Sequence, residues 1–271
     1  MNPIALTQGI HVQHLLYRID RARWAGLPAG EADQVRLRLE ALAARFPGPA
    51  HPRVMILANV GGKADLGFIV FHATLDGLAQ VHRDLEACFP PGTLVPIFSY
   101  LSVTELPEYV PTEDDLRRHI ETAEPRHTPE SPEFEQALEA AKKRNESQKF
   151  YRLNPELQDD WPIVCFYPMS KKRSGADNWY MLDFAARKAL MGTHARTGRK
   201  YAGKISQLIT GSTGLDDWEW AVTLLAHRLD DVKGIVYEMR FDEVTARYGD
   251  FGPFYVNLRL QPAELWQHLH L

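Results

Sequence analysis

Over the first hundred positions, apolar residues recur at helical spacing in some stretches and form β-rich runs in others. Val35, Leu39, Leu42 and Phe46 recur at helical spacing, whereas other stretches are runs of β-forming residues. The predicted order is strand, helix, strand, strand, helix, strand, over residues 11–20, 31–46, 53–60, 65–73, 75–89 and 95–106. This is the order of a ferredoxin-like α+β unit, in which both helices cover one face of an antiparallel sheet.

The pattern changes between Pro107 and Leu153, where prolines and charged residues dominate and a surface helix is predicted over 131–150. After this connector the same order recurs. Strands are predicted over 163–170, 204–213, 219–227 and 252–260, and helices over 181–194 and from about Arg240. Two copies of one topology indicate a duplication. We therefore predict an N-terminal ferredoxin-like half (8–108), a connector (109–155) and a C-terminal half (156–271).

Composition narrows the class of protein. The chain has 271 residues, 45% of them hydrophobic, with a net charge of -4, which is typical of a folded protein without a nucleic-acid partner. No run of 18 apolar residues occurs and the start lacks a secretory pattern, so we expect no membrane contact and a cytoplasmic location. Cys88 and Cys165 are isolated, which disfavours a disulfide or zinc site. No GxGxxG or GxxxxGK[ST] motif supports nucleotide binding, and His268 and His270, at strand spacing, are expected in a solvent-facing tail.

His194 is the candidate metal ligand. It is predicted at the end of a helix in which Leu190 and Met191 lie one turn earlier, so its imidazole should share their face. A neutral imidazole in an apolar pocket is a usual ligand of haem iron, although a core or capping histidine would have the same pattern. Glu243 could accept the other ring N–H, or could be an ordinary acid in the first turn of a helix.

Three segments together carry a family resemblance: MGTHARTGRKYAGKISQLITGST (191–213), YPMSKK (167–172) and MRFDEVTARYGDFG (239–252). They resemble the chlorite dismutase superfamily, and within it the coproheme decarboxylases, over most of Ser99 to Val256. The resemblance implies that the two sheets form an α+β barrel, that five chains form a ring, and that His194 holds the iron of a bound porphyrin.

The resemblance also implies roles for Tyr167, Lys171 and Gln207. The tyrosine of the family is oxidised to a radical that takes hydrogen from a propionate of coproheme, and the lysine binds a propionate and assists proton movement. Gln207 stands where chlorite dismutases have an arginine. A neutral amide lacks the charge that would hold a chlorite anion, so glutamine favours the decarboxylase branch.

Three further residues match positions that contact the porphyrin in the family. Arg152 corresponds to a propionate-binding arginine, Thr245 stands where serine is usual, and Arg199 could gate the pocket entrance. A surface charge is the alternative for both arginines. For the neighbouring Lys172 and Arg173 we favour a solvated basic turn.

The expected reaction is the peroxide-dependent decarboxylation of two propionates of iron-coproporphyrin III (coproheme), which is substrate and redox centre at once, giving haem b. Hydrogen peroxide is the second substrate, and a transient contact with coproporphyrin ferrochelatase would supply the first. Two alternatives remain open: a haem peroxidase or weak chlorite dismutase, and a haem carrier or sensor that needs His194 but not Tyr167 or Lys171.

Overall fold

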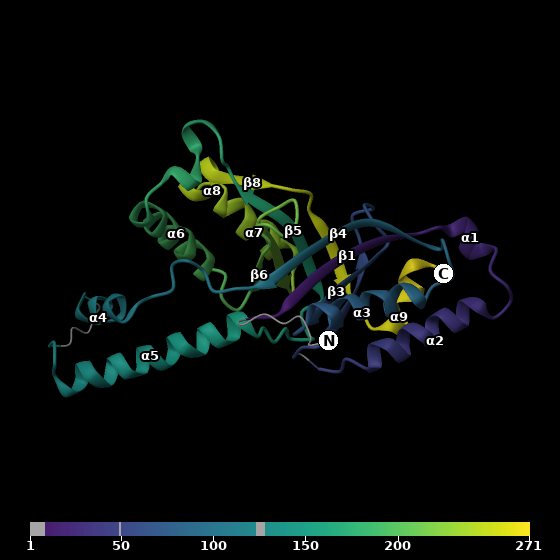
Figure 1. Cartoon of the computed structure of the whole chain (residues 1–271), viewed down its shortest axis with the longest axis horizontal. Helices are drawn as coiled ribbons and strands as arrows, with labels where there is room; N and C mark the ends of the chain where they lie inside the picture. The colour runs from purple at the N-terminus through teal and green to yellow at the C-terminus, as the bar shows by residue number, and fades with distance from the viewer. Residues whose placement is uncertain (1–8, 49, 123–127) are drawn as a thin grey trace.

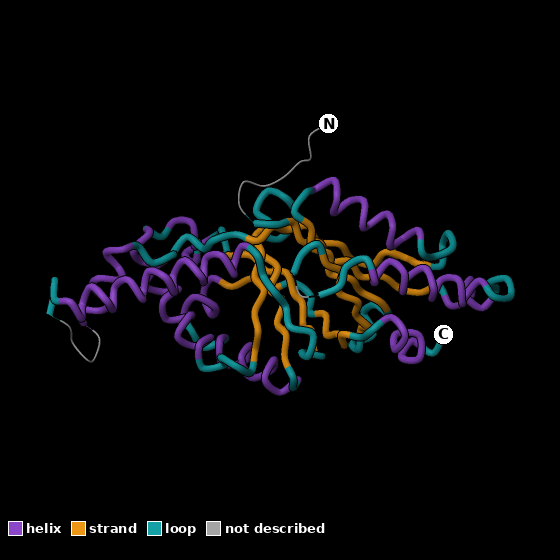
Figure 2. The backbone as a smooth tube through the Cα atoms, turned by 90° about the horizontal axis from the view of Figure 1, so that it is seen from below, coloured by secondary structure: helices purple, strands orange, loops and turns teal. Residues whose placement is uncertain are grey.

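The computed structural model describes residues 9–48, 50–122 and 128–271. Its strands form an antiparallel barrel with helices on the outside (Figures 1 and 2). The strands are β1 (His11–Ile19), β2 (Arg53–Asn59), β3 (Leu66–His72), β4 (Leu94–Thr104), β5 (Ile163–Lys171), β6 (Ile205–Gly211), β7 (Trp220–Ala226), β8 (Gly249–Phe251) and β9 (Tyr255–Arg259).

Strand order confirms the predicted fold class. In the first half the order is β4-β1-β3-β2, and in the second half it is β9-β5-β7-β6, so both halves have the same ferredoxin-like arrangement. Pairing of β4 with β6 and of β2 with β9 joins the two sheets. Because β5 also pairs with β7, the sheet closes on itself and leaves only the short β8 outside the ring.

The helices lie outside the barrel and along the connector. They are α1 (Arg21–Ala25), α2 (Glu31–Ala44), α3 (Leu75–Ala87), α4 (Glu113–Thr122), α5 (Pro132–Leu153), α6 (Phe184–Arg199), α7 (Leu229–Met239), α8 (Glu243–Tyr248) and α9 (Pro262–Leu269), with 3₁₀ turns at Gly175–Asp177 and Trp179–Met181. The predicted connector helix is α5, which extends away from the barrel beside α4 (Figure 1). In the described residues no helix combines the length and the apolar character needed to cross a bilayer.

Two helix predictions and the conformation expected at the end of the chain need correction. The helix predicted to end at His194 continues to Arg199, so the histidine lies inside α6. The helix predicted from Arg240 is α8, which begins at Glu243, whereas Arg240 is the C-cap of the unpredicted helix α7. The terminal histidines are exposed, as predicted, but they do not lie in an extended strand: His268 belongs to α9 and His270 is its C-cap, while Leu265 and Trp266 are buried.

The N-terminal half has a closed apolar core on its outer face. Helices α2, α3 and α9 cover the sheet there, and their buried residues pack on strand residues such as Leu15 and Phe68. Trp266 of α9 stacks on Trp24 of α1 with ring centroids 5.6 Å apart. A separate core fills the barrel interior, formed by residues such as Val12, Leu57, Val164 and Leu225 from both halves.

Candidate functional site

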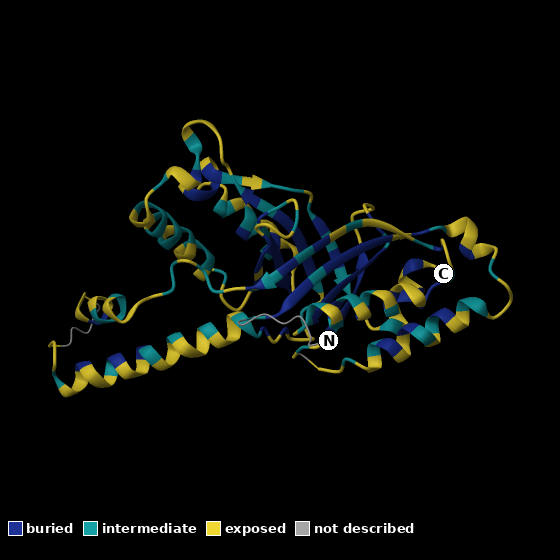
Figure 3. Ribbon diagram, viewed as in Figure 1, coloured by how far each residue is buried: buried dark blue, intermediate teal, exposed yellow. Residues whose placement is uncertain are grey.

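The C-terminal half covers its sheet less completely than the N-terminal half does. Helix α2 buries Val35, Leu39 and Leu42, whereas its counterpart α6 has no buried residue (Figure 3). Helix α6 packs chiefly on α7 and α8. The side chain of Ile209 in β6 points out of the barrel, and because no helix covers it fully, this residue stays 41% exposed. This half of the molecule leaves an apolar strand surface accessible beside α6.

Strand alternation defines which residues share that surface. Leu208 and Thr210 of β6 are buried on the barrel side, so Gln207, Ile209 and Gly211 point outward. The register pairs β6 with β7 and β7 with β5, and directly opposed residues share a face. The C-terminal outer face includes Gln207, Ile209, Gly211, Trp220, Val222, Tyr167, Met169 and Lys171. It carries three of the residues that the sequence singled out.

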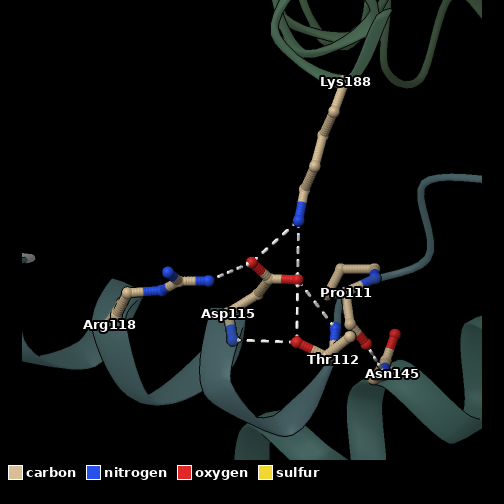
Figure 4. A network of polar contacts seen from close by, with 6 residues as sticks. All are labelled: Pro111, Thr112, Asp115, Arg118, Asn145 and Lys188. Carbon is tan, nitrogen blue, oxygen red and sulfur yellow. Dashed lines mark hydrogen bonds and ion pairs between the residues drawn. The ribbon is translucent and has the colours of Figure 1, made fainter. Parts of the chain in front are cut away.

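Ion pairs hold α6 beside this face. Lys188 donates to both carboxylate oxygens of Asp115 on α4, each at 2.8 Å, and this aspartate also accepts from Arg118 and Thr112 (Figure 4). The Lys188 ammonium is the main cause that lowers the pKa of Asp115. Arg187 pairs with Glu108, and Lys200, just past the helix, pairs with Glu238 of α7. Polar contacts thus hold a helix that buries little apolar surface.

Asp242 holds the candidate ligand His194. Nδ1 of His194 lies 2.8 Å from Oδ2 of Asp242, whose side chain is 6% exposed. The other carboxylate oxygen caps α8 by accepting the backbone N–H of Thr245 at 2.8 Å. This cap fixes the carboxylate, which in turn fixes the ring. With Nδ1–H donated to a carboxylate, Nε2 carries the lone pair that a metal ion needs.

Of the two roles that the sequence left open for Glu243, the structure shows the ordinary acid in the first turn of a helix. Glu243 does not contact His194; it accepts a hydrogen bond from Arg247 at 2.7 Å on the same short helix. Asp242 is the N-cap, and N-cap carboxylates turn back to the first backbone N–H groups. An aspartate directly before a helical run was the signal in the sequence that could have identified it.

Gln207 faces the helix that carries His194. Gly198 lies one turn after the histidine, and a Cβ atom there would be 3.7 Å from Nε2 of Gln207 and 3.4 Å from Cε of Met239. The amide of β6 and the ligand helix therefore approach each other directly.

Tyr167 is buried in the outer face of β5. Its side chain is 6% exposed, and its ring stacks on Phe254 with centroids 4.3 Å apart and lies near Phe251. Burial raises the pKa of the Tyr167 hydroxyl well above its ordinary value. The phenol therefore keeps its proton throughout the physiological range.

Lys171 lies four residues beyond Tyr167 on the same face of β5. Its ammonium is 4.9 Å from the centre of the Trp179 ring, and its backbone N–H donates to Glu219 at 2.7 Å. Burial lowers the pKa of Lys171 to about 8, although the charges of Asp242 and Glu219 oppose this shift. The Lys171 ammonium is poorly hydrated, and a poorly hydrated cation is stabilised by a bound anion.

The other three candidates lie in helices. Thr245 is in α8, 7% exposed and one turn after Asp242. Arg152 in the last turn of α5 and Arg199 at the end of α6 are exposed, and neither forms an ion pair with any described residue. Arg199 follows His194 by five positions, which places it about 140° around the helix. Arg199 therefore lies on a different side of α6 from His194.

Comparison with known proteins places the chain in a family. The sequence profile of the family described as chlorite dismutase matches residues 38–260. The structure resembles that of a haem-binding protein from Thermus thermophilus, with 36% identity over 100% of this chain and 98% of that one and a TM-score of 0.75. It also has the fold of chlorite dismutase from Candidatus Nitrospira defluvii solved with imidazole, at 20% identity over 98% and 97% of the two chains and a TM-score of 0.71. The chain belongs to the chlorite dismutase family.

Proposed function

We propose that this protein is a coproheme decarboxylase, which converts two propionates of iron-coproporphyrin III to vinyl groups with hydrogen peroxide and yields haem b. One observation carries the proposal: a histidine held by a buried carboxylate stands on α6, and the sheet face beside it presents Gln207, Tyr167 and Lys171. The 36% identical relative, itself a haem-binding protein, supports a porphyrin ligand.

The residues of the site fit an iron porphyrin. His194 would hold the iron through Nε2, because Nδ1 is engaged by Asp242. Apolar side chains of Ile209 and Met169 offer a surface for the macrocycle, and Lys171 offers a cation for a propionate. We propose that Arg152, Thr245 and Arg199 add further propionate contacts.

The substrate, once bound, supplies the iron centre that peroxide oxidises. Tyr167 then acts as the relay: its phenol loses an electron and a proton, and the phenoxyl radical takes a hydrogen atom from the β-carbon of a propionate. Loss of carbon dioxide and of one more electron leaves the vinyl group, so each decarboxylation consumes one peroxide. Lys171 holds the reacting carboxylate and keeps it beside the tyrosine.

Gln207 separates this activity from that of a chlorite dismutase. Its amide carries no charge, so it offers little stabilisation to a chlorite or hypochlorite anion beside the iron. The partly exposed face around it is open to a neutral oxidant such as peroxide. We further propose a cytoplasmic homopentamer that receives coproheme by a transient contact with coproporphyrin ferrochelatase.

Mass spectrometry of the bound porphyrin during a peroxide titration tests the proposal. Wild-type protein should give two successive losses of a formic-acid equivalent from coproheme. Tyr167→Phe should bind coproheme but lose the first decarboxylation, because phenylalanine has similar bulk and cannot form the radical. Lys171→Ala should accumulate the three-propionate intermediate.

Two results would overturn the assignment, and a third would overturn the role of Tyr167. An unchanged coproheme mass would favour a haem carrier or sensor. Rapid oxygen release from chlorite would favour a dismutase. Full conversion to haem b by Tyr167→Phe would show that another residue is the relay.

A further inference from the structure

Glu105 reaches the C-terminal outer face from the end of β4. The register places Val103 opposite Gly211, and Glu105 follows two residues later on the same face. A Cβ atom at Gly211 would lie 2.3 Å from the carboxyl atoms of Glu105. The missing side chain of Gly211 is therefore the space that the carboxyl group occupies, flat on β6.

Trp220 fixes this carboxyl group. It lies opposite Gly211 in the register of β7 with β6, and its indole Nε1 donates to Oε1 of Glu105 at 3.2 Å. Partial burial raises the pKa of Glu105, and the indole hydrogen bond opposes that rise. Glu105 is nevertheless an exposed residue, and its carboxylate has no cationic partner among the described residues. A second anion brought against this carboxylate would therefore be repelled.

The charges on this face are arranged with opposite signs on opposite flanks. Gly211, Trp220 and Met169 lie in one row across β6, β7 and β5, and Lys171 lies two residues beyond Met169. Gly211, beneath the carboxyl group of Glu105, and Lys171 are therefore about 10 Å apart across the strands and about 7 Å apart along them. A porphyrin of comparable width, lying on this face, would place one edge near Lys171 and another near Glu105.

We propose that Glu105 is a specificity-determining residue of the porphyrin site, whose carboxylate excludes propionate-bearing edges from the β4–β6 flank and directs them toward Lys171. The inference rests on the proposed function, because it requires a porphyrin on the C-terminal outer face. A substrate with four propionates must bring one near Glu105 in most orientations, whereas haem b with two can present only uncharged edges there. Glu105 therefore weakens the binding of coproheme relative to that of haem b, unless the propionates of coproheme point toward Lys171.

Equilibrium titrations with coproheme and with haem b test the inference by affinity rather than turnover. In Glu105→Gln, which keeps the acceptor for Trp220 and the same shape, affinity for coproheme should rise about five- to tenfold, the order expected for removing one partly exposed like charge. Affinity for haem b should change less than about twofold, because its uncharged edges meet no like charge there. Glu105→Asp should keep the wild-type ratio, and so should Glu133→Gln, which neutralises an exposed carboxylate on α5.

The possible failures can be told apart. A wild-type protein that binds neither porphyrin would overturn the proposed function and this inference with it. Tight binding of both porphyrins with an unchanged affinity ratio in Glu105→Gln would overturn only the inference. An equal gain for both porphyrins would also overturn it, since that result would mean a general effect on the face rather than recognition of carboxylates.

Discussion

Asp242 both caps α8 and binds the ring of the candidate ligand His194. Its oxygens bind the Thr245 backbone and the His194 ring separately, so the start of α8 sets the orientation of the imidazole. Loss of such an outer partner usually costs about 10- to 100-fold in metal affinity or activity. The sequence pattern indicated His194 as a candidate ligand but did not indicate Asp242, because a cap and a first-turn acid differ by one position and helix boundaries are the least certain feature of a pattern.

We predict that Asp242→Asn weakens the iron–histidine bond of the porphyrin complex. The amide carries no charge to favour a strongly basic imidazole, so the iron–histidine stretching frequency in resonance Raman spectra should fall. Glu243→Gln is the matched control and should leave the frequency unchanged, since Glu243 pairs with Arg247. His194→Ala should remove the band and abolish turnover. Equal shifts in Asp242→Asn and Glu243→Gln would contradict the assignment of the ring partner.

The lowered pKa of Lys171 gives coproheme binding a predictable pH dependence. With a pKa of about 8 in the free protein, the ammonium is charged below this pH and neutral above it. A bound propionate favours the charged form, so affinity should be constant well below the pKa and decrease as pH rises through it. Titrations from about pH 6 to about pH 10, a range that spans the pKa on both sides, would measure this decline.

Two variants separate Lys171 from its neighbours in that experiment. Lys171→Met should bind more weakly at low pH and lose the alkaline decline, because no group titrates there. Lys172→Met should keep the wild-type profile, as its side chain is exposed. Tyr167 cannot mimic the effect, since burial raises its pKa out of this range. A decline that persists in Lys171→Met would show that another group is responsible.

Helix α6 illustrates how far an element can be predicted from its own sequence. Its apolar residues Leu190 and Met191 pack with Val244 and Tyr248 of α8 rather than on the sheet, a distinction that helical spacing alone does not contain. The same limitation explains why the sequence pattern predicted a single helix from about Arg240. Two short helices, α7 and α8, meet at Arg240–Asp242, and the break depends on the Asp242 cap rather than on proline or glycine.

We predict that Lys188→Met loosens α6 without altering the residues of the candidate site. The Lys188–Asp115 pair (Figure 4) is partly exposed, with side chains 38% and 19% accessible, so its loss should cost about 1 kcal/mol. If α6 opens locally, amide hydrogen exchange over 184–199 should accelerate about fivefold. Lys149→Met removes a pair within α5 and serves as the control. Unchanged exchange in α6 would mean that its packing on α7 and α8 suffices.

At the scale of the whole molecule, one topology occurs twice with two different outcomes. The strand order and the closed outer core of the N-terminal half follow from periodic apolar residues that the sequence displays directly. The C-terminal half has the same order but α6 buries no side chain, so a surface remains for a ligand. Periodicity predicted the duplication; it did not predict which half would stay open, because that depends on contacts between helices distant in sequence.

Helix α9 adds to this asymmetry, since the chain returns from β9 in the second half to complete the core of the first. Trp266 is 4% exposed and stacks on Trp24, and its indole Nε1 has no hydrogen-bond partner among the described residues. We predict that Trp266→Ala lowers the free energy of unfolding by about 3–5 kcal/mol through the cavity it leaves. Trp266→Phe should cost less, because it keeps an aromatic ring and removes a buried donor that has no partner.

Denaturant unfolding followed by far-UV circular dichroism measures both changes, and a second probe tests whether they are global. Because the barrel closes through pairing between its halves, damage to the N-terminal core should be felt in the C-terminal half. Loss of bound haem absorbance should therefore occur at the same lowered denaturant midpoint as loss of secondary structure. If haem stayed bound after the N-terminal core of Trp266→Ala had unfolded, the two halves would be independent folding units despite the shared barrel.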